Sequence, residues 1–362
     1  MAIPSSITRE FTMNTNRYVA SAMLGLLLGI AVQAVAQPQL PLPQASPAAT
    51  VSQTIGLAEV VVSYHRPAVK GRTVWGNLVP YGEVWRAGAN ENTTIMVSRA
   101  VTIGGKEIPP GTYGLHMIPT QAQWTVILSS NATSWGSYFY KQEEDVLRTT
   151  VQPQPGEFRE WLQFEFSDLS DTSAVLSLCW EKLRIPIAIG VRTQKQVLAY
   201  ARDVYLRGAA GFTPQGFTQA AQYALKAKEY DQALQWADRS IGIAETFAAL
   251  RTKATALEAL GRKEEADQLQ ARALKIATEA DINTLGYTLM AQNKMKEAIE
   301  LFQKNVKDYP DSWNVYDSLA EGLEKMGDTK GAIKNYEMAL KKTTSDTQKK
   351  RITATLSKLR GN

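Results

Sequence analysis

The stretch Tyr64-His65-Arg66-Pro67, Lys70-Gly71-Arg72, Trp75-Gly76 and Tyr81-Gly82-Glu83-Val84-Trp85-Arg86-Ala87-Gly88-Ala89-Asn90-Glu91-Asn92-Thr93-Thr94 is the most informative part of this chain. It sets cationic, aromatic, carboxylate and amide side chains among glycines that favour turns. The surface of an ordinary strand or helix does not need such a mixture. The stretch therefore predicts a long polar loop that holds a candidate site.

Short apolar runs on both sides of this loop predict an antiparallel β domain over residues 52–190. Gly104-Gly105 predicts a tight hairpin turn, because both glycines adopt positive φ readily. About nine short strands at this spacing are typical of a β-sandwich or jelly-roll-like fold. One short helix is expected over 134–144. The expected strands are 58–64, 94–97, 100–103, 112–118, 124–128, 145–151, 161–166, 174–180 and 183–189.

Several separated pieces of residues 52–190 resemble a bacterial secreted family known as domain of unknown function 2911. The resemblance implies the fold of this domain and brings no catalytic residue with it. The pieces are Tyr64-x-Arg66-Pro67, Lys70-Gly71-Arg72, Trp75-Gly76, Pro80-Tyr81-Gly82, Trp85-Arg86-x-Gly88-Ala89-Asn90-Glu91-x-Thr93, Pro110-Gly111-Thr112-Tyr113 and Trp180-Glu181.

Beyond residue 190 the chain is rich in Ala, Leu, Lys, Glu and Gln and shows helical periodicity. Ala233, Ala266, Ala298 and Ala332 recur at spacings of 33, 32 and 34 residues. Helix pairs of this length, with small residues at the close contacts, are similar to tetratricopeptide (TPR) repeats. We therefore expect a linker helix over 191–212, a TPR α-solenoid over 213–346, and a capping helix over 347–362.

The first forty residues are typical of an export signal. Arg17 precedes an apolar run from Val19 to Val35, and Ala34-Val35-Ala36 has the small-x-small form of a cleavage site. Residues 1–36 are thus expected to be a signal peptide, with Met13 as the start, and residues 37–51 a Pro-rich spacer. A retained membrane anchor is the alternative. Cleavage predicts a periplasmic or secreted protein with no stable membrane insertion.

Charge and cysteine content exclude further classes. Residues 52–190 hold eleven Lys and Arg against thirteen Asp and Glu, so the net charge of +5 arises in the helical half. Charges of both signs alternate there, which argues against nucleic-acid binding. The single cysteine, Cys179, lies in an apolar run, and we expect a buried strand residue that forms no intramolecular disulfide.

The polar loop predicts ligand contacts. An arginine can fork onto a carboxylate or phosphate, and an indole ring can form a wall against a sugar or an aromatic group. The alternative is that these side chains satisfy the backbone of a long loop, with Arg86 paired to Glu91. The candidate ligand-binding residues are Arg66, Arg72, Trp75, Trp85, Arg86, Asn90 and Glu91.

The only two histidines are His65 and His116. They form no His-x-His or His-x-x-x-His pair, so no metal site is predicted, and no cofactor motif is present. A periplasmic hydrolase with Glu91 and either histidine as acid and base is an alternative function.

The first interpretation is an exported, non-enzymatic binding or scaffold protein. Its β domain would offer a polar, Trp-walled pocket to a small anionic or sugar-like ligand, and its TPR repeats would recruit a protein or peptide. A third interpretation makes the β domain purely structural and assigns all function to the TPR groove.

Overall fold

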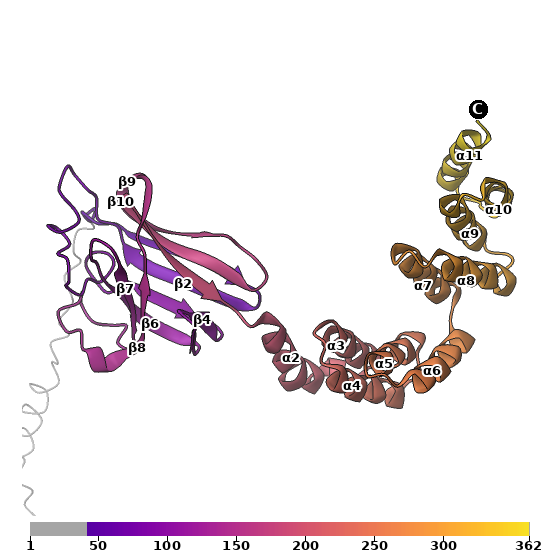
Figure 1. Ribbon diagram of the computed structural model, residues 1–362, viewed down its shortest axis with the longest axis horizontal. Helices are drawn as coiled ribbons and strands as arrows, with labels where there is room; N and C mark the ends of the chain where they lie inside the picture. Colours follow the sequence, from indigo (N-terminus) through magenta and orange to yellow (C-terminus); the bar gives the residue numbers. More distant parts are fainter. Residues whose placement is uncertain (1–41, 362) are drawn as a thin grey trace, which may run out of the picture. The chain divides into compact units, whose positions relative to one another are not determined.

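The structure is a computed structural model that describes residues 42–361 (Figure 1). The expected signal peptide and the first part of the expected spacer lie outside the described residues. Strand β1 (Ala48–Ile55) begins inside the segment expected to be spacer, 37–51, and pairs along its whole length with β2 (Ala58–His65). The expected spacer therefore extends too far, because Ala49 and Val51 pack against the apolar core.

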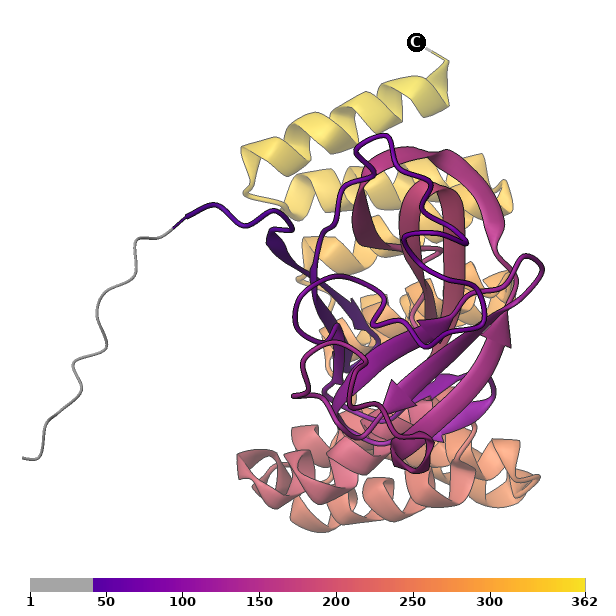
Figure 2. The same ribbon diagram turned by 90° about the vertical axis from the view of Figure 1, so that its left-hand side faces the viewer.

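Ten strands form two antiparallel sheets in the described β domain (Figures 1 and 2). The larger sheet has the order β1-β2-β3-β6-β7-β8, and the smaller has the order β5-β4-β10-β9. Apolar residues of both sheets form one core, so the domain is a sandwich and not a closed barrel. The remaining strands are β3 (Thr94–Val97), β4 (Val101–Ile103), β5 (Lys106–Ile108), β6 (Gly111–Ile118), β7 (Trp124–Ser129), β8 (Asp145–Val151), β9 (Gln154–Ser167) and β10 (Ser173–Gly190).

Three details differ from the sequence expectation. Strand β5 lacks an apolar pattern, since only Ile108 of its three residues is buried. The two strands expected at 174–180 and 183–189 are one strand, β10, whose bulge places Glu181 at a φ of 53°. The helix expected over 134–144 is wrong, apart from a 3-10 turn at Gln142–Glu144. Gly136, at a φ of 63°, takes a left-handed conformation that interrupts a helix there.

The helical half begins with α2 (Thr193–Asp203), followed by two 3-10 turns, Tyr205–Arg207 and Ala209–Phe212. Helix pairs of similar length then follow one another and end in a final helix (Figure 1). They are α3 (Pro214–Lys226) with α4 (Tyr230–Ile243), α5 (Phe247–Ala259) with α6 (Lys263–Ile276), α7 (Glu279–Ala291) with α8 (Met295–Asp308), α9 (Trp313–Met326) with α10 (Thr329–Lys342), and lastly α11 (Asp346–Arg360).

The repeated alanines lie where close helix packing requires small side chains. Each of the four stands on the second helix of its pair and is at most 1% exposed. Phe302 shows the complementary large residue. It fills the space beside Gly286, where an added Cβ would lie 2.3 Å from the ring, and it also approaches Gly322. These contacts carry the repeat geometry from one helix pair to the next.

Most of the buried apolar residues of the helical half fall into three clusters. One joins α2 to α5, a small one joins α5 to α6, and the largest joins α7 to α11. None of these described clusters contains residues of both α6 and α7. Buried apolar residues outside these clusters lie on α5, α6 and α7, among them Leu250, Ala273 and Ile282.

Candidate functional site

A hollow of about 370 Å³ opens on the first helices of three successive pairs. Its wall combines apolar side chains with hydroxyl groups and two charged groups, Arg251 and Asp281. Most of its lining comes from α5 and α7. We call it the α3–α5–α7 hollow, and its lining is Gln222, Leu225, Phe247, Ala248, Arg251, Thr252, Thr255, Asp281, Thr284, Leu285 and Thr288.

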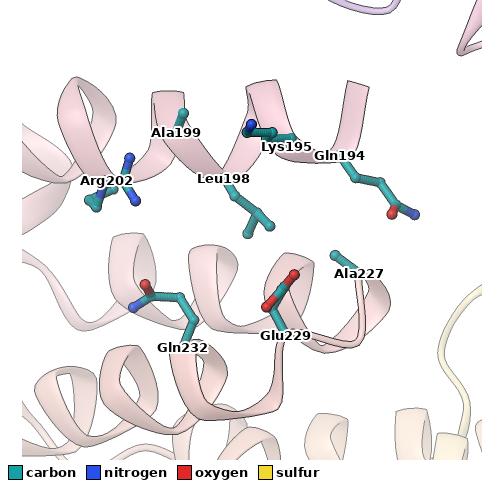
Figure 3. Close-up of a pocket in the computed structure, with 8 residues that line it drawn as sticks. All are labelled: Gln194, Lys195, Leu198, Ala199, Arg202, Ala227, Glu229 and Gln232. Carbon is teal, nitrogen blue, oxygen red and sulfur yellow. The ribbon is translucent and has the colours of Figure 1, made fainter. Parts of the chain in front are cut away.

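A second hollow, of about 460 Å³, lies between α2 and the turn that joins α3 to α4 (Figure 3). Figure 3 shows Leu198 of α2 opposite Glu229 and Gln232. Lys195 and Arg202 face the same space as Glu229, so the wall carries charges of both signs. This mixture favours no particular class of ligand.

In the β domain, strand register brings separated polar residues onto the face of the larger sheet that points away from the core. Leu115 and Met117 of β6 face the core, so His116 between them faces outward. The backbones of Trp85 and Met117 exchange two hydrogen bonds, of 2.8 and 2.7 Å, which sets Arg86 opposite His116. We call this region the outer face of the larger sheet.

The segment of residues 130–141 covers part of this outer face. The Oγ atom of Ser137 lies 2.9 Å from Nδ1 of His116. Burial lowers the pKa of His116 to about 4, while the negative charge of Asp145 opposes that shift. His116 is therefore neutral at pH 7. Asp145 accepts hydrogen bonds from the hydroxyl group of Tyr140 at 2.8 and 2.9 Å and pairs with Arg148 at 3.1 Å.

The distance between Ser137 and His116 is that of a nucleophile and its base. The space beside them, however, is filled by protein atoms and has no room for a ligand. Asn92 and Phe139 are among the residues that close it. This hydrogen bond joins the covering segment to the face of the sheet.

Two of the predicted ligand residues bind the backbone of their own domain. Arg66 donates through Nε to the carbonyl of Leu162 at 2.8 Å. Arg72 donates to the carbonyls of Val69 at 3.1 Å and Ala68 at 2.6 Å. These bonds match the alternative in which arginines satisfy the loop backbone.

The two predicted indole walls belong to an aromatic cluster. The ring of Trp75 contacts those of Trp85, Trp124 and Trp180 at centroid distances of 4.9 to 5.9 Å. Trp85 stacks on Trp180 at 6.1 Å and donates through Nε1 to the carbonyl of Gly88. Both rings thus pack against the apolar core, with Trp124 and Trp180 fully buried.

The pairing expected between Arg86 and Glu91 is not formed. Glu91 lies 3.3 Å from Nδ1 of His65 instead. Arg86 is half-buried beside Gly136, and its Nε atom has no hydrogen-bond partner among the described residues. Burial lowers the pKa of Arg86, and the nearby phenol of Tyr138 opposes that shift. Asn90 takes a left-handed conformation, with a φ of 58°.

Sequence reasoning missed the covering segment, which holds three exposed aromatic side chains. Trp135, Tyr138 and Phe139 are 55%, 80% and 67% exposed. A dense aromatic run between two strands was the available signal. The hydroxyl residues of the α3–α5–α7 hollow gave none, because threonines on a helix look like ordinary surface.

The remaining sequence expectations concern thiol chemistry, metals and membranes. Cys179 is buried in β10, as predicted, and burial raises the pKa of its thiol to about 12. Within residues 42–361, no three His, Cys, Asp or Glu side chains are grouped in a way that could hold a metal ion. In the same range, no helix has the length and apolar character needed to cross a membrane.

Solved structures that are similar to part of this chain include MamA of AMB-1, YrrB and PilF of Pseudomonas aeruginosa. MamA is 21% identical, with 41% of this chain and 82% of MamA covered and a TM-score of 0.27. YrrB, described as a TPR protein with an unusual peptide-binding site, is 13% identical, with 43% and 80% covered and a TM-score of 0.26. PilF is 18% identical, with 40% and 67% covered and a TM-score of 0.28.

No curated protein matches this chain significantly. The β domain, in contrast, has a family match that confirms the resemblance drawn from its sequence. Residues 46–189 match the model of the family described as "Protein of unknown function (DUF2911)".

Proposed function

We propose that this protein is an exported scaffold that binds a protein or peptide segment in the α3–α5–α7 hollow. The hollow is the observation that carries the proposal, since it spans three successive helix pairs and exposes both apolar and polar groups. An extended segment presents polar backbone groups and side chains at regular intervals, and a wall of this kind can contact both.

Binding is tested with an array of short synthetic peptides and the whole chain from residue 37 onward. Thr284→Trp fills the hollow from α7, whereas Gln235→Trp adds the same ring on α4, outside it. We expect Thr284→Trp to abolish peptide binding and Gln235→Trp to preserve it. Equal binding by both variants would place the contact elsewhere.

Export is the second part of the proposal. It rests on Arg17, the apolar run from Val19 to Val35 and the small residues before Gln37. Expression of the full chain in a Gram-negative host should yield a periplasmic protein whose N-terminus is Gln37. Recovery of the uncleaved chain in the membrane fraction would favour the anchor.

A small anionic ligand of the β domain is a second candidate function, favoured by Arg86. A half-buried guanidinium whose Nε has no partner gains from a carboxylate or phosphate. Glucuronate, citrate and phosphate are suitable probes in a thermal-shift assay. We expect at least one to raise the Tm of the wild type and not of Arg86→Met, with Arg159→Met as the matched control because Arg159 lies in an exposed ion pair.

The hydrolase alternative has less support from the same geometry. The His116–Ser137 pair has no adjoining space for a substrate. The His65–Glu91 pair is partly exposed, with half of the Glu91 side chain in solvent. A general acid or base whose pKa is tuned for catalysis usually lies in a water-excluding pocket, so we favour binding over turnover.

A further inference from the structure

The polar groups that line the α3–α5–α7 hollow have a distinct hydrogen-bonding character. Thr255, Thr284 and Thr288 each donate their hydroxyl proton to the backbone carbonyl four residues earlier, at 3.0, 2.8 and 2.8 Å. Their oxygen lone pairs remain available to accept hydrogen bonds. These hydroxyl groups therefore suit a ligand rich in N–H donors, such as a peptide backbone.

The two charged groups of the lining differ in how they are engaged. Asp281 accepts hydrogen bonds from the backbone nitrogen of Thr278 at 3.0 Å and from its hydroxyl group at 2.7 Å, as part of the capping box of α7. Arg251 is half-buried, and among the described residues its guanidinium makes no hydrogen bond and no ion pair within 4 Å. The hollow thus holds a hydrogen-bonded carboxylate and a partly buried cation that has no acidic partner within 4 Å among the described residues.

Burial also affects the ionisation of the Arg251 guanidinium. It lowers the pKa of the guanidinium, and the charge of Glu258, on the same helix, only partly opposes that effect. Lys253, its neighbour on α5, differs because it pairs with Asp238 of α4 at 2.6 Å. A partly buried cation without an acidic partner gains a charge-assisted hydrogen bond when an anion binds beside it.

We propose that the segment bound in the α3–α5–α7 hollow carries a carboxylate that pairs with Arg251. The inference rests on the proposed function and names the chemistry of the partner: an acidic peptide segment. The carboxylate comes from an Asp or Glu side chain or from the C-terminus of the partner chain. Either one accepts two parallel hydrogen bonds from a guanidinium, while the threonine oxygens accept from the N–H groups of the segment.

The test uses an array of short peptides and the whole chain from residue 37 onward. Each acidic peptide is matched with its Asp→Asn or Glu→Gln version, and each free C-terminus with its amide. These pairs separate the two sources of the carboxylate and need no protein variant. Fluorescence polarisation then compares the wild type with Arg251→Ala, Arg251→Lys and the control Arg239→Ala, which removes an exposed charge from α4.

We expect acidic peptides to bind at least about tenfold more tightly than their amide versions. Arg251→Ala should remove that preference, Arg251→Lys should retain part of it, and Arg239→Ala should leave it intact. Peptide binding with no preference for the acid would overturn this inference and leave the proposed function standing. The absence of binding to every peptide would overturn both.

Discussion

Glu91 pairs with His65 and not with Arg86. The Oε2 atom of Glu91 lies 3.3 Å from Nδ1 of His65, and the Nε atom of Arg86 remains without a partner among the described residues. Two residues that stand five positions apart in the loop thus have separate roles. Glu91 belongs to a partly exposed pair, whereas Arg86 places a half-buried guanidinium, whose Nε has no partner, beside Gly136 of the segment of residues 130–141.

This separation predicts opposite effects of two substitutions on stability. Arg86→Met should leave the free energy of unfolding of the β domain unchanged or raise it by about 1 kcal/mol, because it removes a half-buried, unpaired charge. Glu91→Ala should lower it by no more than about 1 kcal/mol, because half of the Glu91 side chain is in solvent. Thermal unfolding followed by tryptophan fluorescence measures both. A large loss for Arg86→Met would mean that Arg86 holds the loop together.

His116 predicts a pH dependence of stability. Its pKa is about 4 in the folded domain and near 6.5 in the unfolded chain, so the unfolded state binds the proton first as the pH falls. The contribution of His116 to the free energy of unfolding is fully present above pH 6.5. It is lost between pH 6.5 and pH 4, and the total loss is about 3 kcal/mol. Denaturant unfolding of the wild type and of His116→Gln at several pH values measures it.

His116→Gln should flatten this part of the pH profile, and the difference between the two proteins isolates the histidine from other titrating groups. Six of the eight tryptophans lie in the β domain, so their fluorescence reports mainly on its unfolding. Parallel profiles for the two proteins would show that folding does not lower the pKa of His116.

Gly286 is predicted to be needed for the close packing of the third helix pair. An added Cβ would lie 2.3 Å from the ring of Phe302, so Gly286→Ala should cost about 1–3 kcal/mol through overpacking. Gly242→Ala is the matched control, since a Cβ on this α4 glycine meets nothing within 4 Å and alanine favours the helix. Circular dichroism during thermal unfolding should show a lower Tm only for Gly286→Ala.

An ion pair with α9 is predicted to stabilise the final helix. Arg351 of α11 donates to both carboxylate oxygens of Asp317 at 2.7 Å. Burial raises the pKa of Asp317, and the hydrogen bond from Arg351 opposes that shift. Arg351→Ala leaves a buried carboxylate unpaired and should cost about 1–3 kcal/mol.

Lys349→Ala is the control for this prediction, because Lys349 and Asp346 form a longer pair of 3.7 Å that is well exposed. Its loss should change stability by less than about 0.5 kcal/mol. Hydrogen exchange of the α11 amides measures the local effect of each variant. Equal protection in Arg351→Ala and in the wild type would contradict the prediction.

Much of the fold could be predicted from the sequence, because local patterns carry it. The glycines of the β4–β5 turn take φ values of 57° and 79°, as their pairing suggested. The repeated alanines are buried because their spacing follows from the length of a helix pair. The sequence patterns failed in β5, where only Ile108 is buried. They also failed in residues 134–144, where aromatic side chains point into solvent.

The sequence by itself determined the class of the two domains and the chemical groups available to a site. Only the tertiary structure decided which of those groups are engaged. Strand register set Arg86 opposite His116. The packing of the loop directed Arg66 and Arg72 to donate hydrogen bonds to backbone carbonyls. Helix stacking gathered residues from α3, α5 and α7 around Arg251. Hydrogen bonds and desolvation depend on contacts between residues that are far apart in the sequence, and no local pattern specifies those contacts.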